Sequence, residues 1–165
     1  MGGLRPPQTG QVTLDGFLPQ EIRPDILQSR VALARQGEVF HGTIEDNIVL
    51  HRSDIVASEL QSLLSNLKLA STITSIENGL RTVLSSDGSP LTRNQCNLIS
   101  LARAILSQPG LLLVDGLLDS LEVEDATDII HYLCRPEHNW TVVVATSQKH
   151  ISDQFENVIP VSTLK

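Results

Sequence analysis

Apolar residues recur with helical spacing in three parts of the 165-residue chain. In the first part, Ser53 and Asp54 precede apolar residues spaced mostly three or four positions apart, which predicts a capped amphipathic helix. A second helical stretch over 69–76 extends this region. The same spacing returns over 93–107, where Pro and Gly follow and end the helix, and over 122–133. The pattern therefore predicts a mainly helical middle segment and one further helix after it.

Two short, continuously apolar runs flank the last of these helices. They cover 110–114 and 141–145, and such runs are typical of strands buried on both faces of a parallel sheet. Strand, helix and strand with short links form a right-handed crossover unit of an α/β fold. Because ligands bind at the carboxyl ends of the strands in such sheets, we expect a crevice near Asp115 and Thr146-Ser147.

The remaining signals lie towards the two ends of the chain. We expect a strand at 11–14 closed by a turn, a helical turn from Pro24, a strand at 30–34, a last helix at 149–155 and a short strand near Val158. The last two elements would complete the α/β unit.

Composition excludes several classes of protein. Lys plus Arg minus Asp plus Glu is 12 − 19 = −7, and an acidic chain without a basic block is a poor candidate for non-specific nucleic-acid binding. The apolar runs are too short to span a bilayer, and the first residues lack the apolar stretch of a secretory signal. Two cysteines, Cys96 and Cys134, form neither a disulfide framework nor a zinc-finger pattern, so a reducing cytoplasm is the simplest expectation.

Six segments, in chain order, resemble the ATP-binding domains of ABC transporters of the exporter type. They are the strand and turn at 11–16, the Q-loop region at 31–47 with Gln36 and Gly42-Thr43-Ile44, the region of the LSGGQ signature at 91–106, the Walker B strand at 111–115, the D-loop at 119–122 and the switch strand at 141–147. This resemblance implies an α/β fold, a partial RecA-like P-loop NTPase parallel sheet with an inserted helical subdomain. The expected division is an α/β core at 1–52 and 108–165 and a helical subdomain at 53–107.

Among the departures from the pattern of that family, three bear most directly on catalysis. The Walker A loop, G-x-x-x-x-G-K-[ST], does not occur in the sequence. It would supply amide groups, a lysine and a hydroxyl to the phosphates and to magnesium. Since it lies upstream in the family, we expect an N-terminally incomplete domain. Gly116 stands where the family has the glutamate that polarises water, and the loss of a general base costs about 100- to 10,000-fold in rate. Ser147 stands where the family has the switch histidine.

The resemblance also implies which residues would contact cofactors, namely ATP and Mg²⁺. Asp115 would hold the metal as a hard oxygen ligand, against the alternative of a polar residue that caps a loop. Arg93 would approach or block a phosphate, against the alternative of a solvated residue at a helix start. We expect His150 at the surface rather than as a displaced switch, and no catalytic residue is assigned. The positions expected to contact nucleotide are Gln36, Thr92, Arg93, Gln95 and Ser147.

The function expected from the resemblance is that of an ABC-transporter ATP-binding-domain-like protein, or a piece of one, impaired in ATP binding and hydrolysis. Two alternatives stay open: a non-catalytic module that docks on a transporter partner, and part of a longer ATPase that drives export. The implied partners are a second ABC ATP-binding domain and a membrane-spanning transporter subunit, at the cytoplasmic face of the membrane. The family's upstream strand is expected beside the strand of Asp115, whose missing neighbour would leave the chain marginally stable.

Overall fold

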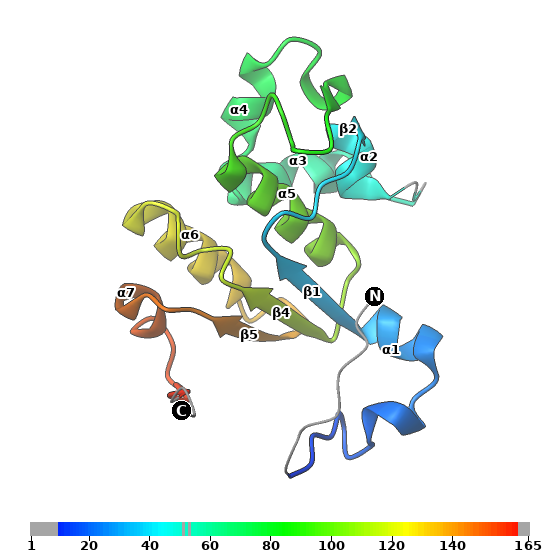
Figure 1. The fold of residues 1–165 in the computed structure, drawn as a ribbon, viewed down its shortest axis with the longest axis vertical. Coiled ribbons are helices and arrows are strands. Elements are labelled where there is room, and N and C mark those ends of the chain that lie inside the picture. Colours follow the sequence, from blue (N-terminus) through cyan, green and yellow to red (C-terminus); the bar gives the residue numbers. More distant parts are fainter. Residues whose placement is uncertain (1–9, 51, 53, 162–165) are drawn as a thin grey trace.

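The computed structural model describes residues 10–50, 52 and 54–161 (Figure 1). Its strands are β1 (Val31–Arg35), β2 (Gly42–Thr43), β3 (Val83–Leu84), β4 (Leu111–Asp115) and β5 (Thr141–Ala145). Its α-helices are α1 (Pro24–Arg30), α2 (Ile44–Val49), α3 (Ala57–Asn66), α4 (Ala70–Ser75), α5 (Arg93–Leu106), α6 (Val123–Leu133) and α7 (Lys149–Ser152). Two 3₁₀ turns, η1 (Pro19–Glu21) and η2 (Gly79–Arg81), complete the described elements.

The main sheet has three parallel strands in the order β1-β4-β5, which confirms the α/β class. Leu33, Leu113 and Val143 share one row across the sheet. The expectation that the strand of Asp115 lacks a neighbour is wrong, because β4 pairs with β1 on one side and with β5 on the other. Within the described chain, the unpaired edges belong to β1 and β5 instead.

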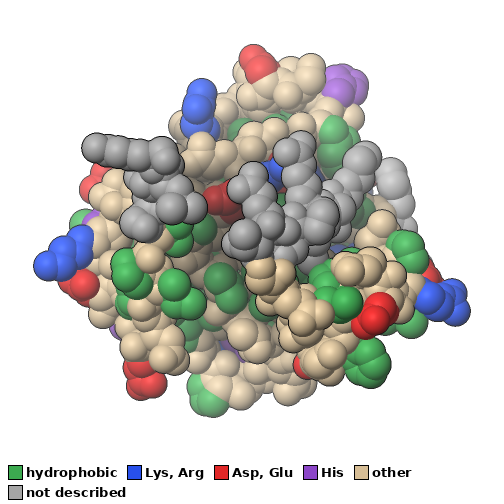
Figure 2. Space-filling view, turned by 60° about the horizontal axis from the view of Figure 1, so that its bottom comes forward, with side chains coloured by type: hydrophobic (Ala, Val, Ile, Leu, Met, Phe, Trp, Pro, Cys, Tyr) green, Lys and Arg blue, Asp and Glu red, His purple; other side chains and the backbone are tan. Residues whose placement is uncertain are grey.

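The two faces of this sheet differ in burial. On one face α5 packs across β1 and β4, and Ala34, Leu112 and Val114 are at most 1% exposed. On the other face Leu33 is 40% exposed and Val143 is 50% exposed. The expectation of strands buried on both faces is therefore wrong, since only one face of the sheet is covered by the described helices. Hydrophobic side chains at the surface are visible in Figure 2.

The helices mostly follow the periodicity of the sequence. The ranges of α4, α5 and α6 agree closely with the predicted stretches. Helix α3 begins at Ala57 with Val56 as its N-cap, so it starts later than predicted, and Ser53 lies outside the described residues. Helix α7 ends at Ser152 rather than at residue 155.

Two predicted strands do not form. The stretch 11–14 contributes only an isolated bridge between Leu14 and Phe17, and residues 156–161 are not in a strand. Both stretches are short and largely exposed, so neither has an apolar surface against which a strand could be fixed.

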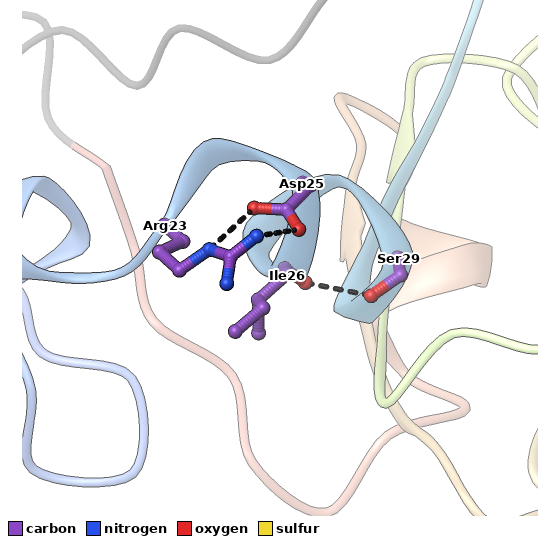
Figure 3. Close-up of polar contacts among 4 residues, drawn as sticks. All are labelled: Arg23, Asp25, Ile26 and Ser29. Atoms are coloured by element: carbon purple, nitrogen blue, oxygen red, sulfur yellow. Dashed lines mark hydrogen bonds and ion pairs between the residues drawn. The ribbon is translucent and has the colours of Figure 1, made fainter.

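The predicted helical turn at Pro24 is α1, which precedes β1. Proline suits the first helical position because its fixed φ matches the helix and its missing N–H needs no partner. The Arg23 guanidinium donates two hydrogen bonds, of 3.1 and 2.8 Å, to the Asp25 carboxylate (Figure 3). Ser29 Oγ donates to the Ile26 carbonyl at 2.9 Å. These contacts are local, and the chain leaves α1 directly into the sheet.

Candidate functional site

The carboxyl ends of the three parallel strands lie together at one end of the main sheet (Figure 1). The pairing register aligns Arg35, Asp115 and Ala145 at this edge. The residues that follow each strand, among them Gln36, Gly116 and the pair Thr146-Ser147, therefore meet there. The sequence predicts a crevice at this place, and the structure brings together Gln36, Asp115 and Ser147 of the six candidate site residues.

Gly116 turns the chain immediately after β4. Its φ of +64° lies in the left-handed region that glycine adopts at little cost. Its N–H donates to the Ala145 carbonyl at 3.0 Å, while its own carbonyl accepts from Gln36 Nε2 at 2.9 Å. The backbone of Gly116 thus connects the ends of β1, β4 and β5, and this position contributes no side chain to the site.

Asp119 is the residue that sequence reasoning missed as part of the site. Its carboxylate accepts hydrogen bonds from Thr146 Oγ1 at 2.5 Å, from Ser147 N at 3.0 Å and from Ser147 Oγ at 2.8 Å. Burial alone would raise the pKa of Asp119, but the hydrogen bonds from Thr146 and Ser147 outweigh it and lower the pKa below its ordinary value. An acidic residue in the loop after a buried strand is the signal that could have found it. Ser147 is thereby held in place by the Asp119 carboxylate of the same chain.

The start of α5 contains the other three candidate residues. Thr92 and Gln95 form a capping box: Gln95 N donates to Thr92 Oγ1 at 3.3 Å, and Thr92 N donates to Gln95 Oε1 at 2.8 Å. Gln95 Nε2 also donates to Thr72 Oγ1 of α4 at 3.1 Å. Arg93 is exposed and makes no hydrogen bond or ion pair with a described residue. The Arg93 side chain and the exposed Thr92 hydroxyl, which accepts a hydrogen bond but donates none to a described residue, are available to a ligand.

One pair of hydrogen bonds links the start of α5 to the loop after β4. Asn94 Nδ2 donates to the Ser120 carbonyl at 2.8 Å, and Ser120 Oγ donates to Asn94 Oδ1 at 2.7 Å. Ser120 directly follows Asp119, which holds Ser147. A continuous chain of contacts therefore runs from α5 through the loop after β4 to the end of β5.

The segment that follows Gln36 is fixed by a buried asparagine of α2. Asn47 is fully buried; its side chain accepts from Phe40 N at 2.9 Å and donates to the Phe40 and Thr43 carbonyls at 2.9 and 3.1 Å. Arg103 of α5 donates to the Asn47 carbonyl at 2.6 Å and to Oδ1 at 3.2 Å, and its guanidinium lies 5.5 Å from the centre of the Phe40 ring. Burial disfavours the charged guanidinium and lowers the pKa of Arg103. The hydrogen bonds to Asn47 offset the free-energy cost of burying this charge.

The implied cofactors fit the described residues only in part. Asp115 is exposed at the edge of the sheet, and its carboxylate with Gln36 Oε1 offers the hard oxygen atoms that Mg²⁺ prefers. No group of three or more His, Cys, Asp or Glu side chains in the described ranges is arranged to hold a metal ion by itself. The hydroxyl and amide donors of Thr146 and Ser147, which could otherwise contact a phosphate, are already bound to Asp119.

His150 differs from its expected place at the surface. It is partly buried in α7, and its Nε2 is buried without a hydrogen-bond partner among the described residues. Cys96 is buried and Cys134 exposed, and burial raises the pKa of both thiols. A raised thiol pKa disfavours the reactive thiolate.

Comparison with known proteins identifies relatives over most of the chain. ABC transporter B family member 21 of Arabidopsis thaliana is 30% identical over 139 residues, which are 84% of this chain and 11% of that protein. The ATP-dependent lipid A-core flippase of Neisseria meningitidis is 30% identical over 154 residues, 93% of this chain and 25% of the flippase. No protein-family model matches the chain.

A solved structure shares the fold. The structure of a bacterial Atm1-family ABC exporter with ATP bound aligns with a TM-score of 0.76 at 23% identity, over 89% of this chain and 26% of the exporter chain. In the described ranges of the present chain, no helix has the length and apolar character needed to cross a membrane. The chain is thus a relative of the ATP-binding proteins of ABC transporters, and it spans between about a tenth and a quarter of the length of the curated relatives it matches.

Proposed function

We propose that this chain is an ABC-exporter ATP-binding-domain-like module that does not hydrolyse ATP. The observation that carries this proposal is the backbone turn at Gly116. The position after Asp115 has no side chain, and its carbonyl is bound by Gln36 at 2.9 Å. A water molecule near the end of β4 therefore meets no general base at this position, and such a loss alone lowers the rate by about 100- to 10,000-fold.

The contacts of Asp119 support the same proposal. A γ-phosphate at Ser147 would have to displace the Asp119 carboxylate from its two hydrogen bonds with Ser147. It would also bring negative charge beside a carboxylate that is already ionised, since the pKa of Asp119 is lowered. Like charges at such close range repel strongly in a partly buried site. We accordingly expect weak binding of ATP at the carboxyl ends of the parallel strands.

An ATPase assay on the purified chain tests this proposal, with Asp115→Asn as the matched control. We expect phosphate release at the background rate for both proteins, and no nucleotide affinity tighter than about 1 mM. Turnover that survives Asp115→Asn comes from a contaminant. Turnover by the unchanged chain that Asp115→Asn abolishes would contradict the proposal.

A second candidate function, docking on a membrane-spanning transporter subunit, is favoured by a groove between α2, α3 and α4. Apolar side chains line this groove, which has a volume of about 430 Å³, and Glu45 and Arg52 contribute charges to it. Leu50 and Val56, at the end of α2 and before α3, are 46% and 60% exposed. An apolar groove with charged groups suits an amphipathic helix of a partner. The apolar lining consists of Val49, Ile55, Ala57, Leu60, Leu64, Ala70, Ile73 and Leu80.

Two substitutions on one helix distinguish docking in this groove from non-specific association. Thr74 lines the groove, whereas Ser71 of the same helix does not, and both are exposed. Thr74→Arg should abolish co-purification with the membrane-spanning half of an ABC exporter expressed with the chain, because the new side chain blocks the groove. Ser71→Arg should leave it unchanged. Equal co-purification of both variants would show that the groove is not the docking site.

A further inference from the structure

A cavity lies at the opposite end of the main sheet from Asp115 and Ser147. Gly110 and Trp140, which directly precede β4 and β5, line it, so it lies beside the amino ends of these parallel strands. Side chains of α3, α5 and α6 also line it. Its volume of about 560 Å³ is that of a typical small-molecule site. This amino-end cavity shares no residue with the candidate functional site.

Packed rings form one wall of the amino-end cavity. The rings of His138 and Trp140 are stacked, with 4.0 Å between their centres and 16° between their planes. The Tyr132 ring is nearly perpendicular to that of His138, at 5.0 Å. Trp140 Nε1 donates to the Leu133 carbonyl at 2.9 Å, which fixes the indole. Because the faces of such rings attract cations, this wall suits a ligand with a positively charged group.

Three charged side chains line the same cavity. Arg30 ends α1, Glu59 lies in the first turn of α3, and Glu137 lies in the loop between α6 and β5. All three are exposed, and none of these side chains makes a hydrogen bond or an ion pair with a described residue. The cavity thus presents one guanidinium and two carboxylates that are free to bind a ligand.

We propose that the amino-end cavity binds a free basic α-amino acid, of which L-arginine is the model. Such a ligand carries one carboxylate and two cationic groups, which is the complement of the three charges in the lining. The ligand carboxylate pairs with Arg30, whose planar guanidinium suits bidentate contacts. Glu137 directly precedes His138 in the ring wall, so it pairs with the ligand's side-chain cation, which also lies against the rings. Glu59 pairs with the α-ammonium group.

The fluorescence of Trp140 tests this binding directly, because it is the single tryptophan of the chain. Titration of the full chain with L-arginine at neutral pH and low salt should give a saturable change, with a Kd between about 10 µM and 1 mM. L-citrulline has a neutral group in place of the guanidinium, and agmatine lacks the carboxylate. Each should bind about 3- to 30-fold more weakly than L-arginine.

Two outcomes of these titrations overturn the proposal. The first is the absence of a saturable fluorescence change together with no heat of binding in isothermal titration calorimetry. The second is equal affinity for L-arginine and L-citrulline, since the cavity would then not recognise the charge of the side chain.

Substitutions in the lining test the individual contacts. Arg30→Gln should weaken binding of L-arginine about 3- to 30-fold and leave that of agmatine unchanged. Glu137→Gln should remove most of the preference for L-arginine over L-citrulline. Glu77→Gln removes an exposed carboxylate between α4 and η2 that does not line the cavity, and this control should change neither affinity. Equal losses for L-arginine and agmatine in Arg30→Gln, or an undiminished preference in Glu137→Gln, would contradict the assigned contacts.

Discussion

Gly88 illustrates, at the scale of one residue, how the loop before α5 depends on a missing side chain. Its φ is +89°, and a Cβ atom at this position would lie 2.4 Å from Cys96 Sγ. Both the backbone conformation and the lack of space therefore require glycine. Gly37 is a suitable control for Gly88, because its φ is also positive, at +76°, but a Cβ atom there would have no neighbouring atom within 4 Å.

We expect Gly88→Ala to lower the free energy of unfolding by about 2–4 kcal/mol, because backbone strain adds to overpacking against Cys96. Gly37→Ala should cost only about 1 kcal/mol, since it adds the strain alone. Urea denaturation measures both values. The double variant Gly88→Ala with Cys96→Ala should recover part of the loss, and an equal cost for the two single variants would refute the overlap with Cys96.

Asp119 leads to a prediction about pH. Because its pKa in the folded chain is lowered, its contacts add stability at pH values above the ordinary pKa of a carboxyl. That contribution disappears as the pH falls through the lowered folded pKa. The difference in Tm between the unchanged chain and Asp119→Ala should thus be largest near neutral pH and shrink in acid. A difference that stays constant down to acid pH would show that the ionised carboxylate is not the source of the stability.

At the scale of elements, Asn47 joins α2, α5 and the segment after Gln36. Removal of its side chain leaves buried backbone groups of Phe40 and Thr43 without partners. Asn47→Ala should lower the free energy of unfolding by about 1–3 kcal/mol, whereas Asn157→Ala at an exposed position should change it by less than about 0.5 kcal/mol. Chemical denaturation of the two variants measures the contrast, and equal values would mean that the network contributes nothing.

The elements also show what the sequence can predict. Helices α4, α5 and α6 and strands β4 and β5 follow from periodicity and from apolar runs, because their apolar residues are needed for the core. The predicted start of α3 is wrong because Ser53 and Asp54 are good capping residues by type, although the helix begins at Ala57 with a valine cap. Capping preference is a weak local signal, and packing of the helix against its neighbours overrides it.

Part of the candidate site can also be predicted from the sequence. The meeting of Asp115 with Ser147 follows from the rule that parallel strands end at one edge. The role of Asp119 cannot be deduced in this way, because its hydrogen bonds span 27 and 28 residues of sequence and depend on how two loops approach each other. The partners of Gln36 and Asn94 are long-range in the same way.

At the scale of the whole molecule, the sheet has one covered face and one open face. Leu112 points into the core and is fully buried, while Leu33 is 40% exposed on the open face. Leu112→Ala should cost about 2–5 kcal/mol of stability, and Leu33→Ala less than about 1.5 kcal/mol. Thermal and urea unfolding give both values. Similar costs would mean that the open face is covered in solution.

The anchoring of Ser147 by Asp119 also has a consequence for isotope exchange. Ser147 is exposed at the surface, where an amide proton would ordinarily be replaced by deuterium from the solvent almost at once. Its N–H is instead bound to Asp119, next to the residue that Asn94 binds. We therefore expect slow deuterium labelling of the Ser147 amide, and its rate reports how often the hydrogen bond to Asp119 opens.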